Sequence, residues 1–188
     1  MVKSIMPSEE WQESKKLFHR GGKDWYILHV NPVEEGGLTT SIEEMYDHKP
    51  TKQDKEDLYN AWLDLMKREK IQEVTVYDVS ENVNSFEIDS IVSWLPKADR
   101  VGLRNSLTVE QTSGHVTTTL YLNGHAIVLP ISSALAMLDT LELYAIECYR
   151  TTEQHKAAIQ DKVIIEQVEN YDYTTGYPQH PVFNSQVE

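Results

Sequence analysis

The chain has 188 residues and an acidic balance, with 30 Asp and Glu against 17 Lys and Arg and a formal net charge of −13. This length suits one domain or two small ones, since domains commonly run to ~100–150 residues. The charge argues against nucleic acid and anionic membrane as partners, because both are bound by clustered Lys and Arg, and no such basic run is present. The single cysteine excludes an intrachain disulfide. The sequence shows no signal-peptide pattern and no run of ~18 apolar residues, so we expect a protein made in the cytoplasm.

The first part of the chain is expected to contain an arm followed by a strand–helix region. Residues 1–22 mix charged and polar side chains and are predicted as an N-terminal arm, mobile or bound to a partner, with a short helix over Ser8–Phe18. Residues 23–76 form the strand–helix region. Asp24–Val30 has the aromatic and β-branched content of a strand. Apolar residues three or four apart predict an amphipathic helix over Thr51–Lys70, capped by Thr51.

Residues 77–170 are expected to form the main α+β domain. Partial alternation predicts short strands near Val74–Tyr77, across the boundary with the preceding region, and over Ser85–Ile88. The second of these strands is expected to pair with Ile91–Leu95 across a tight turn. A helix is predicted over Lys97–Gln111, since the proline before it suits a first helical turn.

The strongest turn signal is Asn123-Gly124, because both residues tolerate the positive φ that a two-residue hairpin turn requires. It predicts a hairpin of Thr117–Leu122 and His125–Pro130. Ser132 or Ser133 is predicted to cap a long amphipathic helix that packs on this hairpin.

A break is predicted in that long helix, because Thr151 with Gln154 fits a capping box. Beyond residue 170 the chain is rich in Tyr, Gly and Pro, and residues 171–188 are predicted as a C-terminal tail that lies against the body or a neighbour. The expected fold is therefore α+β, with a small antiparallel sheet with hairpins packed against amphipathic helices and extended terminal arms.

The sequence contains no motif typical of a cofactor or metal site. The glycine pairs lack both the Walker lysine pattern and the GxGxxG spacing, so no nucleotide is implied. The seven histidines are scattered without an i, i+2 or i, i+4 pair, so no metal site is predicted. They are His19, His29, His48, His115, His125, His155 and His180.

Candidate catalytic groups are equally weak. Cys148 and His155 lie seven residues apart, and Cys148 falls on an apolar stripe, so it is interpreted as a buried small hydrophobe rather than a thiol nucleophile. Carboxylate pairs such as Glu43-Glu44 and Glu142 with Glu147 are expected by composition in an acidic chain. They are weak support for glycoside hydrolysis, which needs an acid and a base at a set separation in a cleft. No catalytic residue, cofactor or metal ligand is predicted.

Aromatic residues favour a binding role. Tyr and Trp are typical of interfaces because they bury a large area and keep a polar end. Aromatic side chains in the N-terminal arm and the C-terminal tail are therefore candidate interface residues, although the tail has the alternative of packing on its own subunit. They are Trp11, Phe18, Tyr171, Tyr173, Tyr177 and Phe183.

A run of residues from Tyr77 to Tyr177 carries a family resemblance. It comprises Tyr77-Asp78, residues 83–86, Trp94-Leu95, residues 100–103, residues 117–122, Leu129-Pro130, Leu141-Glu142, Tyr144, Cys148-Tyr149, Thr152, residues 155–159 and residues 171–174. Residues 77–177 resemble a domain of unknown function found in bacteriophage tail and tail-fibre proteins, in the form carried by phages of Bacteroides-type hosts.

The resemblance implies a virion location and no catalysis. The expectation is a structural adaptor in a phage tail, made in the host cytoplasm, present in several copies and binding other tail or fibre proteins. Two alternatives stay open: a cytosolic chaperone for tail-fibre assembly and a small tail-associated hydrolase.

Overall fold

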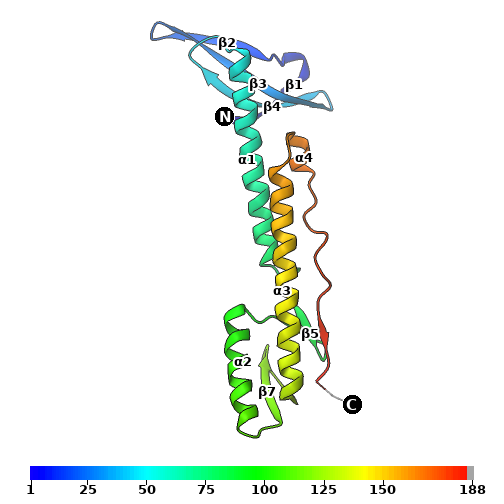
Figure 1. Ribbon diagram of the computed structural model, residues 1–188. Helices are drawn as coiled ribbons and strands as arrows, with labels where there is room; N and C mark the ends of the chain where they lie inside the picture. The colour runs from blue at the N-terminus through cyan, green and yellow to red at the C-terminus, as the bar shows by residue number, and fades with distance from the viewer. Residues whose placement is uncertain (186–188) are drawn as a thin grey trace. The chain divides into compact units, whose positions relative to one another are not determined.

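The computed structural model describes residues 1–185 and has an α+β fold of helices and antiparallel sheets, as the sequence predicts (Figure 1). The chain forms two compact units. Unit 1 comprises Met1–Lys70 and Asp161–Tyr171, and unit 2 comprises Ile71–Gln160 with the residues that follow Tyr171. These bounds differ from those expected from sequence, because the division falls inside a helix and Asp161–Tyr171 belongs to unit 1.

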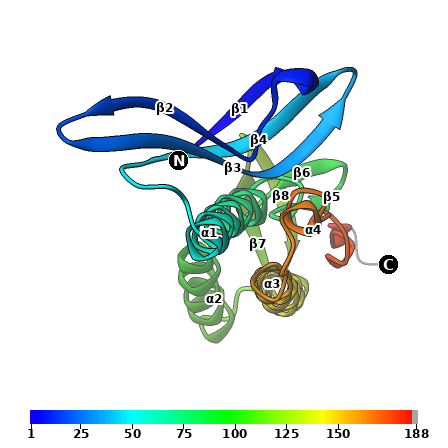
Figure 2. The same ribbon diagram turned by 90° about the horizontal axis from the view of Figure 1, so that it is seen from above.

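Unit 1 contains a four-stranded antiparallel sheet in the order β1-β4-β3-β2. The predicted N-terminal arm and its helix over Ser8–Phe18 are wrong, because this segment supplies both edge strands and, between them, a short 3₁₀ turn. Gly21 and Gly22, which suggest the end of an arm in the sequence, have positive φ and form the hairpin turn between β2 and β3. Figure 2 shows this turn at one end of the sheet. The strands are β1 (Val2–Pro7), β2 (Ser14–Arg20), β3 (Lys23–Glu35) and β4 (Leu38–Tyr46).

The helix α1 (Lys52–Asp78) begins as predicted and runs further than predicted. Thr51 Oγ1 accepts a hydrogen bond from the Asp54 amide at 3.2 Å, and the Thr51 amide donates to Asp54 Oδ2 at 2.7 Å, a reciprocal cap. The strand predicted over Val74–Tyr77 is wrong. Val74 is fully buried on the helix, and this tertiary burial outweighs the preference of β-branched residues for strands.

The core of unit 1 lies on one face of the sheet. Leu28, Val30 and Ile42 are buried there. Ile42 lines one hollow with Trp62 of α1 and Ile165 of α4 (Ile165–Glu169), so the sheet and both helices adjoin.

Unit 2 contains the predicted hairpins, the helix predicted after Pro96 and the long helix predicted after Pro130. The predicted cap of the long helix at Ser132 or Ser133 is wrong, because the helix begins at Ile131 and both serines lie in its first turn. β7 (Thr117–Leu122) pairs with β8 (His125–Pro130) across Asn123-Gly124, both with positive φ. The predicted pairing of the segments that flank Asp89-Ser90 is also present, with both turn residues at positive φ. The remaining elements are β5 (Phe86–Ile88), β6 (Ile91–Ser93), β9 (Val182–Phe183), α2 (Lys97–Thr112) and α3 (Ile131–Gln160).

The helix break predicted at Thr151 and Thr152 is wrong, because α3 continues through both residues. Thr152 Oγ1 donates to Asp78 Oδ1 at 2.6 Å and lies 3.0 Å from the Tyr177 hydroxyl. Thr151 Oγ1 donates to the Gly176 carbonyl at 3.4 Å. These hydroxyls bind other parts of unit 2 rather than capping a new helix, and the chain leaves the helix only after Gln160.

The C-terminal segment packs on unit 2, which is one of the two predicted alternatives. Tyr173 and Tyr177 place their rings 5.7 Å and 5.6 Å from the Tyr77 ring. Phe183 lies in β9, which adds a parallel strand to β5, and its ring meets that of Phe86 at 5.9 Å. The last three residues of the predicted tail lie outside the described residues.

Candidate functional site

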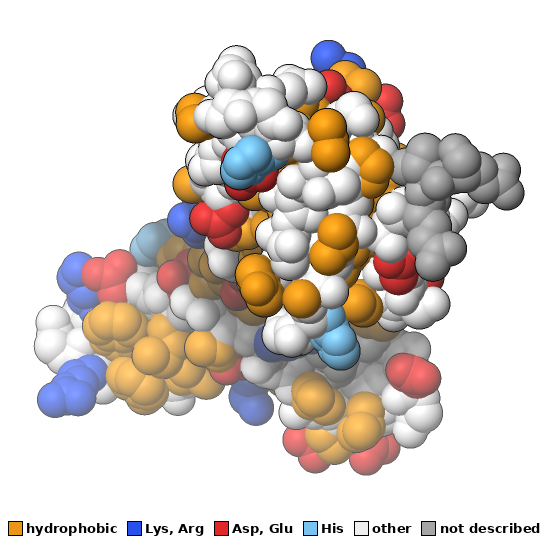
Figure 3. Space-filling view, turned by 90° about the horizontal axis from the view of Figure 1, so that it is seen from below, with side chains coloured by type: hydrophobic (Ala, Val, Ile, Leu, Met, Phe, Trp, Pro, Cys, Tyr) orange, Lys and Arg blue, Asp and Glu red, His pale blue; other side chains and the backbone are white. Residues whose placement is uncertain are grey.

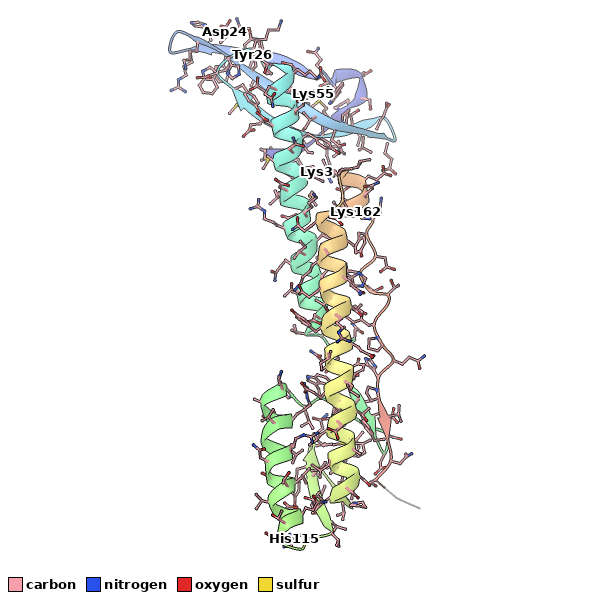
Figure 4. The ribbon with its side chains drawn as sticks, in the orientation of Figure 1. Lys3, Asp24, Tyr26, Lys55, His115 and Lys162 are labelled. Atoms are coloured by element: carbon pink, nitrogen blue, oxygen red, sulfur yellow. The ribbon has the colours of Figure 1, made fainter. Side chains whose placement is uncertain are left out.

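The predicted interface residues of the C-terminal segment are largely engaged by their own chain. Tyr173, Tyr177 and Phe183 make the ring contacts given above, and each is half-buried. Tyr171 lies in unit 1, with the Lys162 ammonium 5.3 Å from its ring (Figure 4 labels Lys162). The aromatic character of these residues is therefore used inside the subunit.

The two N-terminal candidates, Trp11 and Phe18, differ in their exposure to solvent. Trp11 is half-buried, and its indole nitrogen is buried without a hydrogen-bond partner in residues 1–185. Phe18 on β2 is about half exposed and stacks on Trp25 of β3, with the ring centroids 6.1 Å apart. Of these two residues, Phe18 presents an exposed surface for a partner.

Phe18 belongs to a larger group of apolar side chains, which we name the sheet patch. In the strand register Phe18 opposes Trp25 and Ile27 opposes Met45, and strand alternation places these residues on one face of the sheet. One hollow is lined by Phe18, Trp25 and Met45, and another by Ile27 and Met45 with the N-terminal residues of the chain, so the two adjoin at Met45. Hydrophobic side chains adjoin one another at this end of the sheet in Figure 3. The sheet patch comprises Met1, Val2, Phe18, Trp25, Ile27 and Met45.

Sequence reasoning found only Phe18 among these residues. The alternation of Trp25 and Ile27 within a predicted strand was a usable signal for a common face. Val2 and Met45 lie in β1 and β4, which the sequence did not predict as strands. Their place in the patch depends on pairing between segments more than 30 residues apart, as in the Val2–Glu43 register.

Basic residues border the sheet patch on β2 and the following turn. Lys16 Nζ lies 2.6 Å from Asp24 Oδ2, and His19 Nδ1 lies 2.7 Å from Asp24 Oδ1 (Figure 4 labels Asp24). Hydrogen bonds from Lys16 and His19 lower the pKa of the Asp24 carboxyl. Lys15 and Arg20 form no ion pair with the residues that the structure describes. Two cations at this edge therefore have no acidic partner in residues 1–185.

Buried Ser41 and His29 lie near the half-buried Glu43 on the unit 1 sheet, so their geometry is compared with that of a catalytic serine. His29 Nδ1 lies 3.1 Å from Ser41 Oγ and 3.8 Å from Glu43 Oε2. A serine nucleophile needs its histidine to contact the hydroxyl with one ring nitrogen and the acid with the other. Here both contacts use Nδ1. Ser41 is buried and also contacts Ser4 Oγ at 3.3 Å, so the group is a packed polar cluster.

The cluster gives a pH-dependent contribution to stability. Burial lowers the pKa of His29, and the nearby Glu43 carboxylate raises it by less. A histidine with a lowered folded pKa stabilises the protein above its unfolded value of about 6.5, and this stability is lost as the pH falls below that value. The pKa of His48 is raised by hydrogen bonds to Asp47 and Asp54, so its effect has the opposite sign. The contribution of His29 is therefore measured in a protein that already carries His48→Gln, so that His48 does not offset it.

In that background we expect the urea concentration at the unfolding midpoint to decrease when the pH is lowered from 7.5 to 5.5. We expect His29→Gln to make this decrease smaller. Urea unfolding of the two proteins at both pH values checks the expectation. An equal fall with and without His29 would show that the buried imidazole does not titrate in this range.

Metal and thiol chemistry gain no support from the geometry. Within residues 1–185 no three His, Cys, Asp or Glu side chains come together as metal ligands. Cys148 is buried as predicted, and burial raises the pKa of its thiol, which disfavours the reactive thiolate. No helix in the described part of the chain combines the length and apolar content needed to cross a membrane.

Comparison with known proteins gives no match: no family model matches the chain, and neither a curated protein nor a solved structure does. The sheet patch and its basic border are therefore the features on which a functional proposal rests.

Proposed function

We propose that this protein is a non-enzymatic binding subunit, and that it serves as an adaptor between tail or tail-fibre subunits of a bacteriophage. The observation that carries the binding role is the sheet patch, in which Val2, Phe18 and Met45 are exposed beside one another. Exposed apolar side chains that adjoin one another are typical of surfaces that bind another protein. The patch thus replaces the tail tyrosines as the principal contact surface.

The phage assignment is supported by the resemblance of residues 77–177. Of these residues, all but Asp161–Tyr171 lie in unit 2, where the C-terminal segment is already held by its own chain through Tyr173 and Tyr177. We therefore assign the scaffold role to unit 2 and the binding role to the sheet of unit 1. The adaptor is made in the host cytoplasm and enters the virion in several copies.

An assembly chaperone is the second candidate, because the same exposed patch would suit a protein that binds fibre subunits transiently. A tail-associated hydrolase is weaker. Glu43 and Glu44 are consecutive on β4, and successive strand residues point to opposite faces, so they form no catalytic pair. Glu142 is bound by Arg100.

The proposal is tested by placing Asp at Met45, an exposed residue of the patch. Met45→Asp puts a charge into the apolar surface, so we expect incorporation into purified particles to fall at least tenfold while the protein stays folded. Quantitative protein analysis of particles, with circular dichroism of the purified variant, checks this. Val128→Asp is the matched control, since Val128 is an exposed strand residue of unit 2 with 61% exposure against 57% for Met45.

The outcomes separate the candidates. A fixed copy number per particle for the wild-type protein supports the adaptor. Absence from particles, with binding to free fibre subunits, supports the chaperone. Release of sugars from host polysaccharide by the purified protein, lost on replacing one carboxylate, would revive the hydrolase.

A further inference from the structure

The strand β2 is an open edge of the unit 1 sheet. It lies last in the order β1-β4-β3-β2, and all seven of its residues are exposed. An edge strand carries backbone N–H and C=O groups that can pair with an added strand. Extended peptides bind proteins in this way by β-strand addition.

The charge on this edge is opposite to that of the chain as a whole. Residues 14–23 hold four of the 17 Lys and Arg and no Asp or Glu, in a chain with 30 acidic residues. Of these four, Lys16 and Lys23 are paired with Asp24 and Asp47. Lys15 and Arg20 have no acidic partner in residues 1–185, so the edge retains uncompensated positive charge.

We propose that β2 accepts an acidic, extended segment of a partner protein as an additional strand of the sheet. This inference rests on the proposed binding role and names the chemistry of the partner. Backbone hydrogen bonds to β2 would hold the segment, and its carboxylates would face Lys15 and Arg20. Lys15, Phe18 and Arg20 share one face of the sheet, because they oppose alternate residues of β3. An apolar side chain on that face of the segment, between the two carboxylates, would extend the sheet patch beside Phe18.

A second copy of this chain is a poorer occupant of the same edge. Antiparallel pairing of two β2 strands would set Lys15 and Lys16 of one copy near His19 and Arg20 of the other, and like charges directly opposite destabilise a strand pair. Lysine on an edge strand is also a common means of preventing self-association. The same charges that oppose self-pairing favour an acidic segment.

The test uses the full chain and a labelled synthetic peptide of about eight residues in which every second position carries glutamate, valine and glutamate in turn, so that one face of the extended peptide matches Lys15, Phe18 and Arg20. We expect the peptide to bind in fluorescence anisotropy, with affinity that falls as salt is raised. We also expect it to slow hydrogen exchange of the amides of Ser14–Arg20. Two comparison peptides, one with lysine in place of glutamate and one with alternate amide nitrogens methylated, should not bind.

The variant Lys15→Glu/Arg20→Glu reverses the two unpaired charges and should weaken binding by at least tenfold. Arg68→Glu/Arg150→Glu is the matched control, because it makes the same change of net charge at exposed helix residues outside the unit 1 sheet and should bind as the wild type does.

Several results would overturn strand addition. These are absence of binding by the glutamate peptide, equal binding of the methylated or lysine peptide, and exchange protection confined to residues outside β2. The experiments also distinguish a failure of the strand-addition proposal from a failure of the proposed virion role. If particles contain the protein and the peptide does not bind β2, strand addition alone is wrong. If the peptide binds β2 and particles lack the protein, the virion role alone is wrong.

Discussion

Glu142→Ala is expected to destabilise unit 2 by about 3 kcal/mol, because it leaves the buried Arg100 guanidinium without its carboxylate. Arg100 is 6% exposed, and its Nε and Nη2 donate to Glu142 Oε2 at 3.1 Å and 2.9 Å. Removing one partner of a buried ion pair costs about 3–5 kcal/mol. We place the effect at the lower end of that range because the Glu142 side chain is 38% exposed.

Urea unfolding followed by circular dichroism measures this loss. Arg100 keeps two contacts in the variant, a hydrogen bond from Nη1 to the Leu95 carbonyl at 2.7 Å and the face of Trp94 at 5.3 Å. These contacts hold the charge in place but do not neutralise it.

Two further variants show whether the loss of stability comes from the unpaired charge of Arg100. Glu147→Ala removes an exposed carboxylate from the same helix, α3, and should change the free energy of unfolding by less than about 0.5 kcal/mol. Arg100→Met in the Glu142→Ala background removes the unpaired charge and should restore part of the stability. If Glu142→Ala were no more harmful than Glu147→Ala, the buried arginine would not depend on its carboxylate.

Local signals made parts of the fold predictable from sequence. Asn123-Gly124 defines its turn through positive φ, which both of these residue types tolerate. Thr51 caps α1 through a reciprocal bond with Asp54, only three residues away. Each of these features is decided by neighbouring residues.

The features that were mispredicted depend on distant contacts. β1 pairs with β4, for example Ser4 with Ser41, and no short window of sequence contains both strands. Val74 favours a strand by its own preference but is buried on a helix. The Thr152 hydroxyl resembles a helix cap, yet it donates to Asp78, 74 residues earlier.

The candidate site was difficult for the same reason. Aromatic composition drew attention to Tyr173 and Tyr177, but an aromatic ring with a polar end suits packing inside a subunit as well as binding between subunits. Both rings meet Tyr77 of the same chain. The sheet patch instead joins Val2 to Met45 through strand register, which sequence alone did not provide.

Leu141→Ala is expected to cost about 2–5 kcal/mol, because Leu141 is 0% exposed in the core of unit 2 and its removal leaves a cavity. The same core contains Phe86, Leu107 and Leu120, so α3 is packed against β5, α2 and the β7–β8 hairpin through one cluster. Protein interiors are close-packed, and these neighbours can fill the cavity only in part.

The matched control is Leu143→Ala, two residues along α3, where the side chain is 65% exposed. It should cost less than about 0.5 kcal/mol, since little apolar surface returns to water. Urea unfolding of both variants, with hydrogen exchange at residues 117–130, measures the difference and locates it. A similar loss for the two leucines would mean that α3 does not pack through the face that carries Leu141. Because the resemblance to phage proteins lies in this unit, such a result would also remove the scaffold role assigned to it.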